Sequence, residues 1–302
     1  MHGNPGAPRL RSGARTADTR THSMEQIPAF YFQPDQLRKL ADLHRDAFRT
    51  AEPFAHVVFD RFVPDEILDV VVREFPEVDQ IDWTFYGPGA TRHSANKGIE
   101  KVGSSDENQF GLFTRHSMQQ LNSGTFLRFL EDLTGTRDII ADPTYNDCGM
   151  HSTGRGGRLL IHTDTNRHPI KGPFHQRYNL ILFLNKEWRD EYGGHLELWD
   201  RTAKKCIRKI LPEFNRCVIF DTGRYSFHGH PHPLACPEGR RRNSLALYYY
   251  VLNRPNSDSY AGMQTEVTWV PTTEDRIRQT LKKFIPPIVF DVRDRIRRRV
   301  SP

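Results

Sequence analysis

Six short apolar runs follow one another through the second half of the chain and constrain the fold more than any other sequence feature. They cover residues 158–164, 178–185, 195–200, 205–211, 216–221 and 244–252. Gly, Pro and polar residues separate these runs, and no helical pattern lies between them. Runs of this length and spacing are typical of an all-β sandwich or barrel, whereas a parallel α/β sheet needs helices between its strands. The sequence therefore predicts a jelly-roll-type core.

Helices are predicted ahead of this core. Apolar residues recur at helical spacing over residues 34–50, 65–75 and 113–134, and residues 56–63 are strand-like. Gly135 suits the C-terminal end of the third helix because glycine adopts the left-handed conformation without strain. Residues 86–111 are rich in Gly, Ser, Asn and charge, which predicts a long loop and a candidate lid over a substrate.

The sequence divides into four segments. Residues 1–26 are predicted to be a disordered extension, and Met24 is a candidate start of the natural chain. Residues 27–144 form a helical and β support region, 145–252 the β-rich catalytic core, and 253–302 a basic helical extension. The fold class is therefore α+β, with N-terminal helices, a jelly-roll core and a C-terminal helical tail.

Composition narrows the class of protein. A hydrophobic content of 37% and a charged content of 26% over 302 residues predict a soluble globular chain. No apolar run reaches the roughly 18 residues that a membrane helix requires, and the first 22 residues lack the apolar centre of a secretory signal. The 4 cysteines form no C-x-x-C pair, which argues against a zinc site or a disulfide framework and favours the cytoplasm.

Positive charge is concentrated locally. The net charge of +6 reflects arginine clusters at residues 240–242 and 293–299. No aromatic residues interleave with these arginines, so we expect solvated surface and do not expect nucleic-acid binding.

One short motif points to a metal. His162 and Asp164 lie two residues apart in a strand-like run, where alternate side chains share a face, so both can bind one ion. His44 and Asp46 have the same spacing, but they lie in a predicted helix, where such positions diverge. A third ligand is expected from a distant strand, and His228 follows the run 216–221 after a turn.

Two histidines and one carboxylate with open coordination positions are the ligand set of non-haem iron(II) oxygenases. Three histidines compete for the third place. Pro231 and Pro233 favour a turn after Gly229, so His228 is preferred. His230 and His232 are then expected to line the mouth of the site or to face solvent.

A keto-acid cosubstrate needs a positive charge for its far carboxylate. Arg242 and Ser244 share a face at the start of the last strand-like run. A guanidinium binds a carboxylate through two parallel hydrogen bonds, and the serine hydroxyl can add a donor.

These pieces resemble the 2-oxoglutarate/iron(II) oxygenases, and within them the prolyl 4-hydroxylase-like group with its bacterial members. The matching stretches are His162-x-Asp164, Asn179-x5-Asn185-Lys186-x-Trp188, Gly193-Gly194-His195-Leu196-Glu197-Leu198, His228-Gly229 and Arg242-x-Ser244-x-Ala246. The resemblance implies a double-stranded β-helix, cupin-like in architecture, with iron(II) bound by His162, Asp164 and His228. It further implies that Arg242 binds 2-oxoglutarate, that Asn179 adds a polar contact, and that ascorbate keeps the iron reduced.

Three functions compete on this basis. The first is a dioxygenase that uses dioxygen and 2-oxoglutarate to hydroxylate an unactivated C–H bond of a small molecule, with release of succinate and CO2. The second is a peptidyl, prolyl-type hydroxylase. Phe183 argues against it, because it stands where animal oxygen-sensing prolyl hydroxylases carry a hydrogen-bonding tyrosine. The third is a non-catalytic metal-binding sensor or scaffold.

Overall fold

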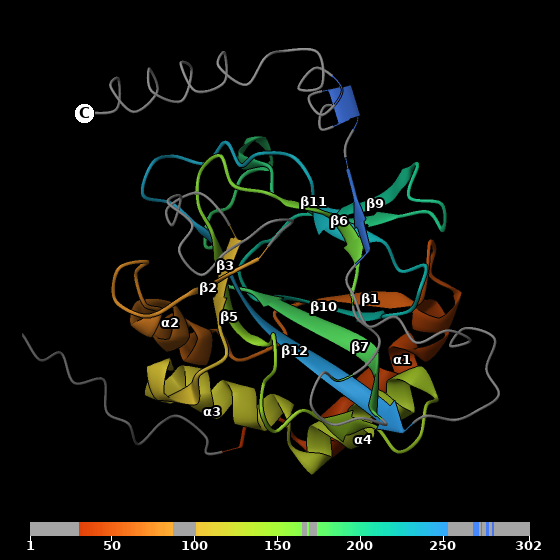
Figure 1. Cartoon of the computed structure of the whole chain (residues 1–302). Helices are drawn as coiled ribbons and strands as arrows, with labels where there is room; N and C mark the ends of the chain where they lie inside the picture. Colours follow the sequence, from red (N-terminus) through yellow and green to blue (C-terminus); the bar gives the residue numbers. More distant parts are fainter. Residues whose placement is uncertain are drawn as a thin grey trace, which may run out of the picture.

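Two antiparallel sheets face each other at the centre of the computed structural model (Figure 1). The structure describes residues 30–86, 101–164, 168, 174–252 and 268–271, together with residues 273, 276, 277 and 280. The apolar runs of the second half of the chain supply most of the strands. The predicted α+β class with a jelly-roll core is confirmed.

The major sheet has 8 strands. Its order is β1 (His56–Asp60), β10 (Arg216–Asp221), β7 (Phe174–Phe183), β12 (Arg242–Leu252), β5 (Gly149–Thr153), β3 (Lys101–Ser104) and β2 (Thr84–Phe85), and β4 (Ile140–Ala141) also pairs with β12. Strands from the N-terminal third of the chain therefore complete both edges of this sheet.

The minor sheet has 5 strands in the order β13 (Thr268–Val270), β6 (Leu159–Thr163), β11 (His228–His230), β8 (Leu196–Trp199) and β9 (Cys206–Ile210). Between the two sheets, a small apolar cluster closes one end of the interior. It consists of Phe183, Leu196, Leu198, Ile210, Val218 and Phe220. The polar residues described below fill the remaining interior.

Four helices cover the outer face of the major sheet (Figure 1). They are α1 (Pro34–Thr50), α2 (Asp65–Glu74), α3 (Leu112–Leu121) and α4 (Gly124–Thr134). The side chains of each central strand alternate, so Leu180 and Leu182 of β7 pack in the helical core while Phe183 packs in the cluster between the sheets. We call the face of the major sheet that is turned towards the minor sheet the inner face.

The predicted third helix is wrong in one respect. Residues 113–134 form two helices, because the chain breaks at Asn122 and Ser123. The Ser123 side chain accepts a hydrogen bond from Phe126 N at 3.3 Å and so caps the second helix. The predicted end at Gly135 is confirmed, since this residue is left-handed with φ 75°.

The predicted loop 86–111 is also partly wrong. Residues 101–104 form β3 in the major sheet, and residues 107–109 form a short 3-10 helix, while residues 87–100 lie outside the described part. Most of the predicted helical tail lies outside it too, but Thr268–Val270 form a strand that the sequence analysis missed. Among the described helices, none combines the length and apolar character needed to span a membrane.

Asn215 connects the turn between β1 and α2 to the residues that precede β10. It adopts a left-handed φ of 61°, and its buried side chain accepts a hydrogen bond from Val63 N at 2.9 Å and donates to Val63 O and Asp65 Oδ1. We expect Asn215→Ala to lower the free energy of unfolding by about 2–4 kcal/mol, because buried backbone groups lose their partners. Urea unfolding measures the effect. Asn215→Gly adopts the positive φ without strain, so this variant measures the loss of the side-chain hydrogen bonds alone. Full stability of both variants would contradict the prediction.

Candidate metal centre and cosubstrate pocket

Three ligand-type side chains meet between the sheets. His162 of β6 and His228 of β11 are direct cross-strand partners, with ring centroids 4.5 Å apart. Asp164 follows β6 and places Oδ1 3.5 Å from His162 Nε2 and Oδ2 3.8 Å from His228 Nε2. One ligand atom from each residue lies within 4.8 Å of the others. The two-residue spacing of His162 and Asp164 therefore places both side chains together, and the pairing of β11 with β6 places His228 beside them.

The histidine rings are oriented for metal binding by their second nitrogens. His162 Nδ1 lies 2.8 Å from Leu160 O, and His228 Nδ1 lies 2.9 Å from Ser226 O. A carbonyl accepts only, so each Nδ1 carries the proton, and the lone pair of each ring is at Nε2. Metal-binding histidines use this arrangement to fix their tautomer and direction.

The carboxylate of Asp164 is also held in place. Gln176 Nε2 and Asn179 Nδ2 each donate to Asp164 Oδ2 at 3.1 Å. Burial disfavours its ionised form, but interactions with His228 and His162 outweigh burial and hold the pKa of Asp164 well below its usual range. Burial lowers the pKa of His228 to about 4, although Asp164 opposes this. At neutral pH the carboxylate is ionised and the imidazole is neutral, as metal ligation requires.

Arg242 lies deeper in the same interior. Its side chain is buried, its Nε donates to Gly194 O at 2.7 Å, and its guanidinium carbon lies 4.9 Å from the centre of the Phe183 ring. No carboxylate of the described residues lies within ion-pair distance, and burial lowers the pKa of Arg242 to about 9. An uncompensated buried charge is costly, so this pocket favours an anion. It suits the far carboxylate of a keto acid.

The other two cosubstrate candidates also lie on the inner face. Ser244 is buried and pairs with Phe183 of β7 on one side and His151 of β5 on the other. Asn179 is engaged by Asp164, as described above, and its Oδ1 is buried without a hydrogen-bond partner. Asn179 therefore contacts the carboxylate of Asp164, whereas the resemblance implied a contact with the cosubstrate.

His230 was expected at the mouth of the site or in solvent, and the solvent alternative is wrong. The backbone stays extended through Gly229, so His230 belongs to β11 and is buried, with both ring nitrogens unpaired. The predicted turn begins only after it. His232 is exposed, with its Nε2 3.9 Å from Glu197 Oε1.

Sequence reasoning missed further residues around the centre. Trp269 of β13 stacks on His162 with ring centroids 4.8 Å apart. Lys101 of β3 and His151 of β5 lie on the inner face of the major sheet, opposite the minor sheet that carries Trp269. The β-branched and aromatic run around Trp269 could have indicated a strand, but nothing local indicates which strand it joins.

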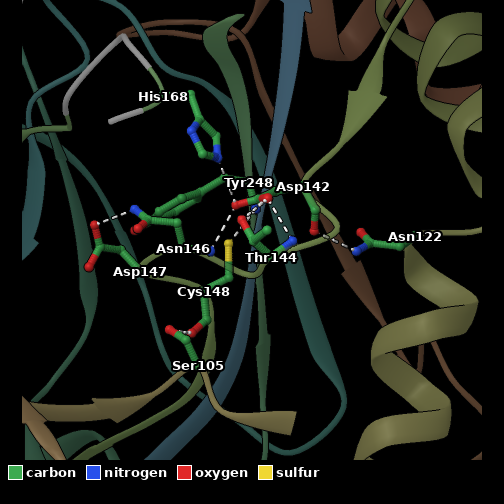
Figure 2. A network of polar contacts seen from close by, with 9 residues as sticks. All are labelled: Ser105, Asn122, Asp142, Thr144, Asn146, Asp147, Cys148, His168 and Tyr248. Atoms are coloured by element: carbon green, nitrogen blue, oxygen red, sulfur yellow. Dashed lines mark hydrogen bonds and ion pairs between the residues drawn. The ribbon is translucent and has the colours of Figure 1, made fainter. Parts of the chain in front are cut away.

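A polar network shapes the turn that leads into β5 (Figure 2). Asp142 accepts hydrogen bonds from Thr144 N at 2.8 Å and Asn146 N at 2.8 Å. Asp142 Oδ2 also lies 3.3 Å from Nε2 of His168, which follows β6 in the sequence. Tyr248 N donates to Cys148 Sγ at 3.1 Å, which ties the end of this turn to β12. The network therefore fixes where β5, the strand of His151, begins.

Gly229 allows β11 to approach β6 closely. A Cβ at this position would lie 2.7 Å from Leu160 O and 2.9 Å from Leu159 O, and backbone cannot move away as a flexible side chain can. We expect Gly229→Ala to lower the free energy of unfolding by about 1–3 kcal/mol and to weaken metal binding by displacing His228. Thermal unfolding and metal titration by calorimetry measure the two effects. Gly223→Ala, where a Cβ meets nothing closer than 3.8 Å, is the control; equal behaviour of both variants would contradict the prediction.

The fold and the site together define a class of protein. A jelly-roll interior brings two histidines and one carboxylate together, beside a buried guanidinium that has no carboxylate partner among the described residues. This donor set fits a divalent metal of the iron(II) type, and the guanidinium fits an anionic cosubstrate. The class is that of the non-haem iron(II) enzymes.

Comparison with known proteins narrows the class. Residues 148–250 match the sequence model of the 2OG-Fe(II) oxygenase superfamily. The chain is 24% identical over 212 residues to the prolyl 3-hydroxylase OGFOD1 of Mus musculus, covering 68% of this chain and 34% of that protein. It thus spans about a third of the length of this curated relative.

A solved structure shares the fold. A prolyl hydroxylase of Trichoplax adhaerens, in complex with a peptide fragment of the hypoxia inducible factor oxygen degradation domain, superposes with a TM-score of 0.51 and 16% identity. The match covers 76% of this chain and 94% of that one. Residues 148–250, which contain all three clustered side chains and Arg242, are thus similar to the 2OG-Fe(II) oxygenase superfamily, whose metal is iron(II) and whose cosubstrate is 2-oxoglutarate, and the solved structure shows the same fold.

Proposed function

We propose that this protein is a dioxygenase that hydroxylates an aliphatic C–H bond of a second substrate. The observation that carries the proposal is the convergence of His162, Asp164 and His228 beside the buried, unpaired guanidinium of Arg242. The three convergent side chains would hold iron(II), and Arg242 would bind the far carboxylate of 2-oxoglutarate. Iron(II), 2-oxoglutarate and dioxygen together supply the oxidising power, and succinate and CO2 are released.

The protein's own residues position the reactants and keep the site dry. Leu160 O and Ser226 O hold the histidine rings, while Gln176 and Asn179 hold the carboxylate. These contacts keep the ligand set in place before any reactant binds, which lowers the cost of assembling the site. Trp269 covers His162 and limits access of water from that side.

The substrate belongs to one of two chemical classes. A small molecule is the first candidate. A peptidyl proline is the second, and the likeness to a protein named prolyl 3-hydroxylase supports it. Phe183, with no hydroxyl at that position of the inner face, argues that cosubstrate binding differs from that of oxygen-sensing prolyl hydroxylases.

Succinate release tests the function. The purified protein, supplied with iron(II), 2-oxoglutarate and ascorbate, is expected to release succinate faster when a substrate of the correct class is added. Proline-containing peptides and a panel of small metabolites separate the two classes, and omission of ascorbate tests its role. A protein that binds iron(II) and 2-oxoglutarate but releases no succinate under any condition would be a sensor or scaffold instead.

We further propose that the protein works in the cytoplasm. All 4 cysteines are free thiols, and Cys148, Cys217 and Cys236 are buried. Thiols without disulfides are the usual state in a reducing compartment. Fractionation of cells that express a tagged chain tests the location.

A further inference from the structure

We propose that Lys101 recognises an anionic group, a carboxylate or a phosphate, on the second substrate. The inference rests on the proposed dioxygenase function and names the chemistry of the missing substrate. It assigns Lys101 as a specificity-determining residue of the site.

Strand pairing places Lys101 on the same face as Arg242. Both residues pair with Thr153 of β5, Arg242 from β12 on one side and Lys101 from β3 on the other. Residues paired across antiparallel strands point to the same face, so the three form one row. This face is the inner one, because side chains an odd number of positions away point to the opposite face. Val102, one position after Lys101, and Leu245, three positions after Arg242, both pack in the helical core on the outer face.

The Lys101 side chain is held in position by aromatic rings. Its ammonium lies 5.0 Å from the centre of the Tyr86 ring, and Tyr86 meets His151 edge-on at 5.3 Å. Gly103 leaves the room for both rings, since a Cβ there would lie 2.5 Å from His151 Cδ2 and 2.7 Å from Tyr86 Cε2. Such packing reduces the entropy that a lysine loses when it binds a ligand.

The ammonium faces the reaction site. Burial lowers the pKa of Lys101 to about 8, against the opposing effect of Asp164; Arg242 and Asp147 are the other charges that it senses. Because Lys101 and Arg242 share a row on the inner face, the ammonium lies on the same side of the sheet as the guanidinium. A cation in this place interacts with whatever binds above the cosubstrate.

Lys101 has no counter-ion in the described part of the chain. None of the ion pairs there includes it, and Asp147, whose charge it senses, accepts a hydrogen bond from Asn146 at 2.9 Å. Burial raises the pKa of Asp147, although its hydrogen bond with Asn146 and the charge of Lys101 oppose this. Lys101 therefore resembles Arg242 in presenting a positive charge that no carboxylate of the described residues pairs with.

A count of charges assigns this cation to the second substrate. The two positive charges of iron(II) and the one of Arg242 are balanced by Asp164 and by the two carboxylates of 2-oxoglutarate. The charge of Lys101 is left over. A negative group on the second substrate would neutralise it, and interiors of low dielectric favour such neutralisation.

Depth in the interior separates the two cations. Arg242 is only 5% exposed, whereas Lys101 is partly exposed at the β3 side of the sheet, two strands away. Two strand spacings amount to roughly 10 Å, so the two cations are far enough apart to serve two different ligands, and the more buried one suits the cosubstrate. Lys101, the more exposed of the two cations, is then available to the second substrate.

Matched substrate pairs test the inference through succinate release. The panel contains prolyl peptides with Glu or Gln beside the proline, small carboxylic acids with their amides, and sugar phosphates with the free sugars. We expect the anionic member of the active pair to be preferred, and its class identifies whether peptide, carboxylate or phosphate is the source. Lys101→Met is expected to raise the KM for that substrate by roughly 10- to 100-fold, and Lys101→Arg to restore most of the loss.

A binding experiment decides the matter independently of turnover. Zinc-loaded protein saturated with 2-oxoglutarate is titrated calorimetrically with inorganic phosphate and with acetate. We expect at least one anion to bind wild type roughly 10-fold or more tightly than it binds Lys101→Met. Lys205→Met, which removes an exposed lysine from the turn before β9, is the matched control and should bind as wild type does.

The outcomes distinguish this inference from the proposed function. Equal anion binding by wild type and Lys101→Met, or binding to neither, overturns the role of Lys101. So does a neutral substrate turned over equally by both, which leaves the dioxygenase function intact. A change confined to the affinity for 2-oxoglutarate would assign Lys101 to the cosubstrate instead. A failure of wild type to consume 2-oxoglutarate under any condition would overturn the function itself. Circular dichroism and thermal unfolding confirm that each variant is folded.

Discussion

Replacing His228 with Ala is expected to lower succinate release by roughly a thousandfold or more, because the metal carries chemistry that no side chain can supply. The loss should appear directly as weakened iron(II) binding in a calorimetric titration under anaerobic conditions. His228 is one of only two imidazoles in the cluster, and its Nδ1 bond to Ser226 O already directs Nε2 towards Asp164. Asp164→Ala is expected to have a comparable effect.

The neighbouring histidines provide controls within four residues. His232→Ala should bind iron(II) and release succinate as wild type does, because that side chain is 72% exposed and lies away from the cluster. His230→Ala should retain the metal, since His230 is buried in the interior but is not a member of the cluster. Loss of metal binding in His230→Ala with retention in His228→Ala would show that the wrong histidine has been assigned.

Replacing Arg242 with Met is expected to raise the KM for 2-oxoglutarate by roughly 100-fold, because a desolvated bidentate ion pair is lost. Arg242→Lys should recover only part of this, since an ammonium cannot bind a carboxylate through two parallel bonds. Succinate release at increasing 2-oxoglutarate concentrations gives both values. Arg208→Met, at an exposed position of β9, is the matched control.

Stability distinguishes a binding arginine from a structural one. Burial lowers the pKa of Arg242 to about 9, so the charged form destabilises the free protein below that pH, and stability rises as pH increases through the folded pKa. At pH 7 we therefore expect Arg242→Met, without cosubstrate, to unfold at the same or a higher temperature than wild type. 2-Oxoglutarate should raise the unfolding temperature of wild type more than that of the variant. A variant that unfolds well below wild type would indicate a structural role.

Local pattern was enough for much of the fold and for the core of the site. The helices at 34–50 and 65–74 follow from apolar spacing, and the runs at 178–185, 216–221 and 244–252 lie in β7, β10 and β12. His162 and Asp164 converge because alternate residues of a strand share a face, which is a property of the backbone alone. Arg242 and Ser244 share the inner face for the same reason.

Elements that depend on a cap or on a partner were not predictable in this way. The break at Ser123 depends on one hydroxyl that caps α4, and helical periodicity continues across it. Lys101–Ser104 and Thr268–Val270 are too short to show a clear period, and each is recognised as a strand by its pairing, with β5 and β6 respectively. His230 is buried because Gly229 allows close approach to β6, which overrides the turn that the prolines favour.

The sequence by itself predicted the class of the core, the meeting of His162 and Asp164 and the shared face of Arg242 and Ser244, since each follows from the period of a single strand, and it named His228 as the third member from its place after another strand. Only the tertiary structure decided that His228 meets them, that Trp269 covers His162 and that Lys101 joins Arg242 in one row. These relations depend on which strands pair and in which register. That choice minimises the free energy of the whole chain and is not encoded in any one segment.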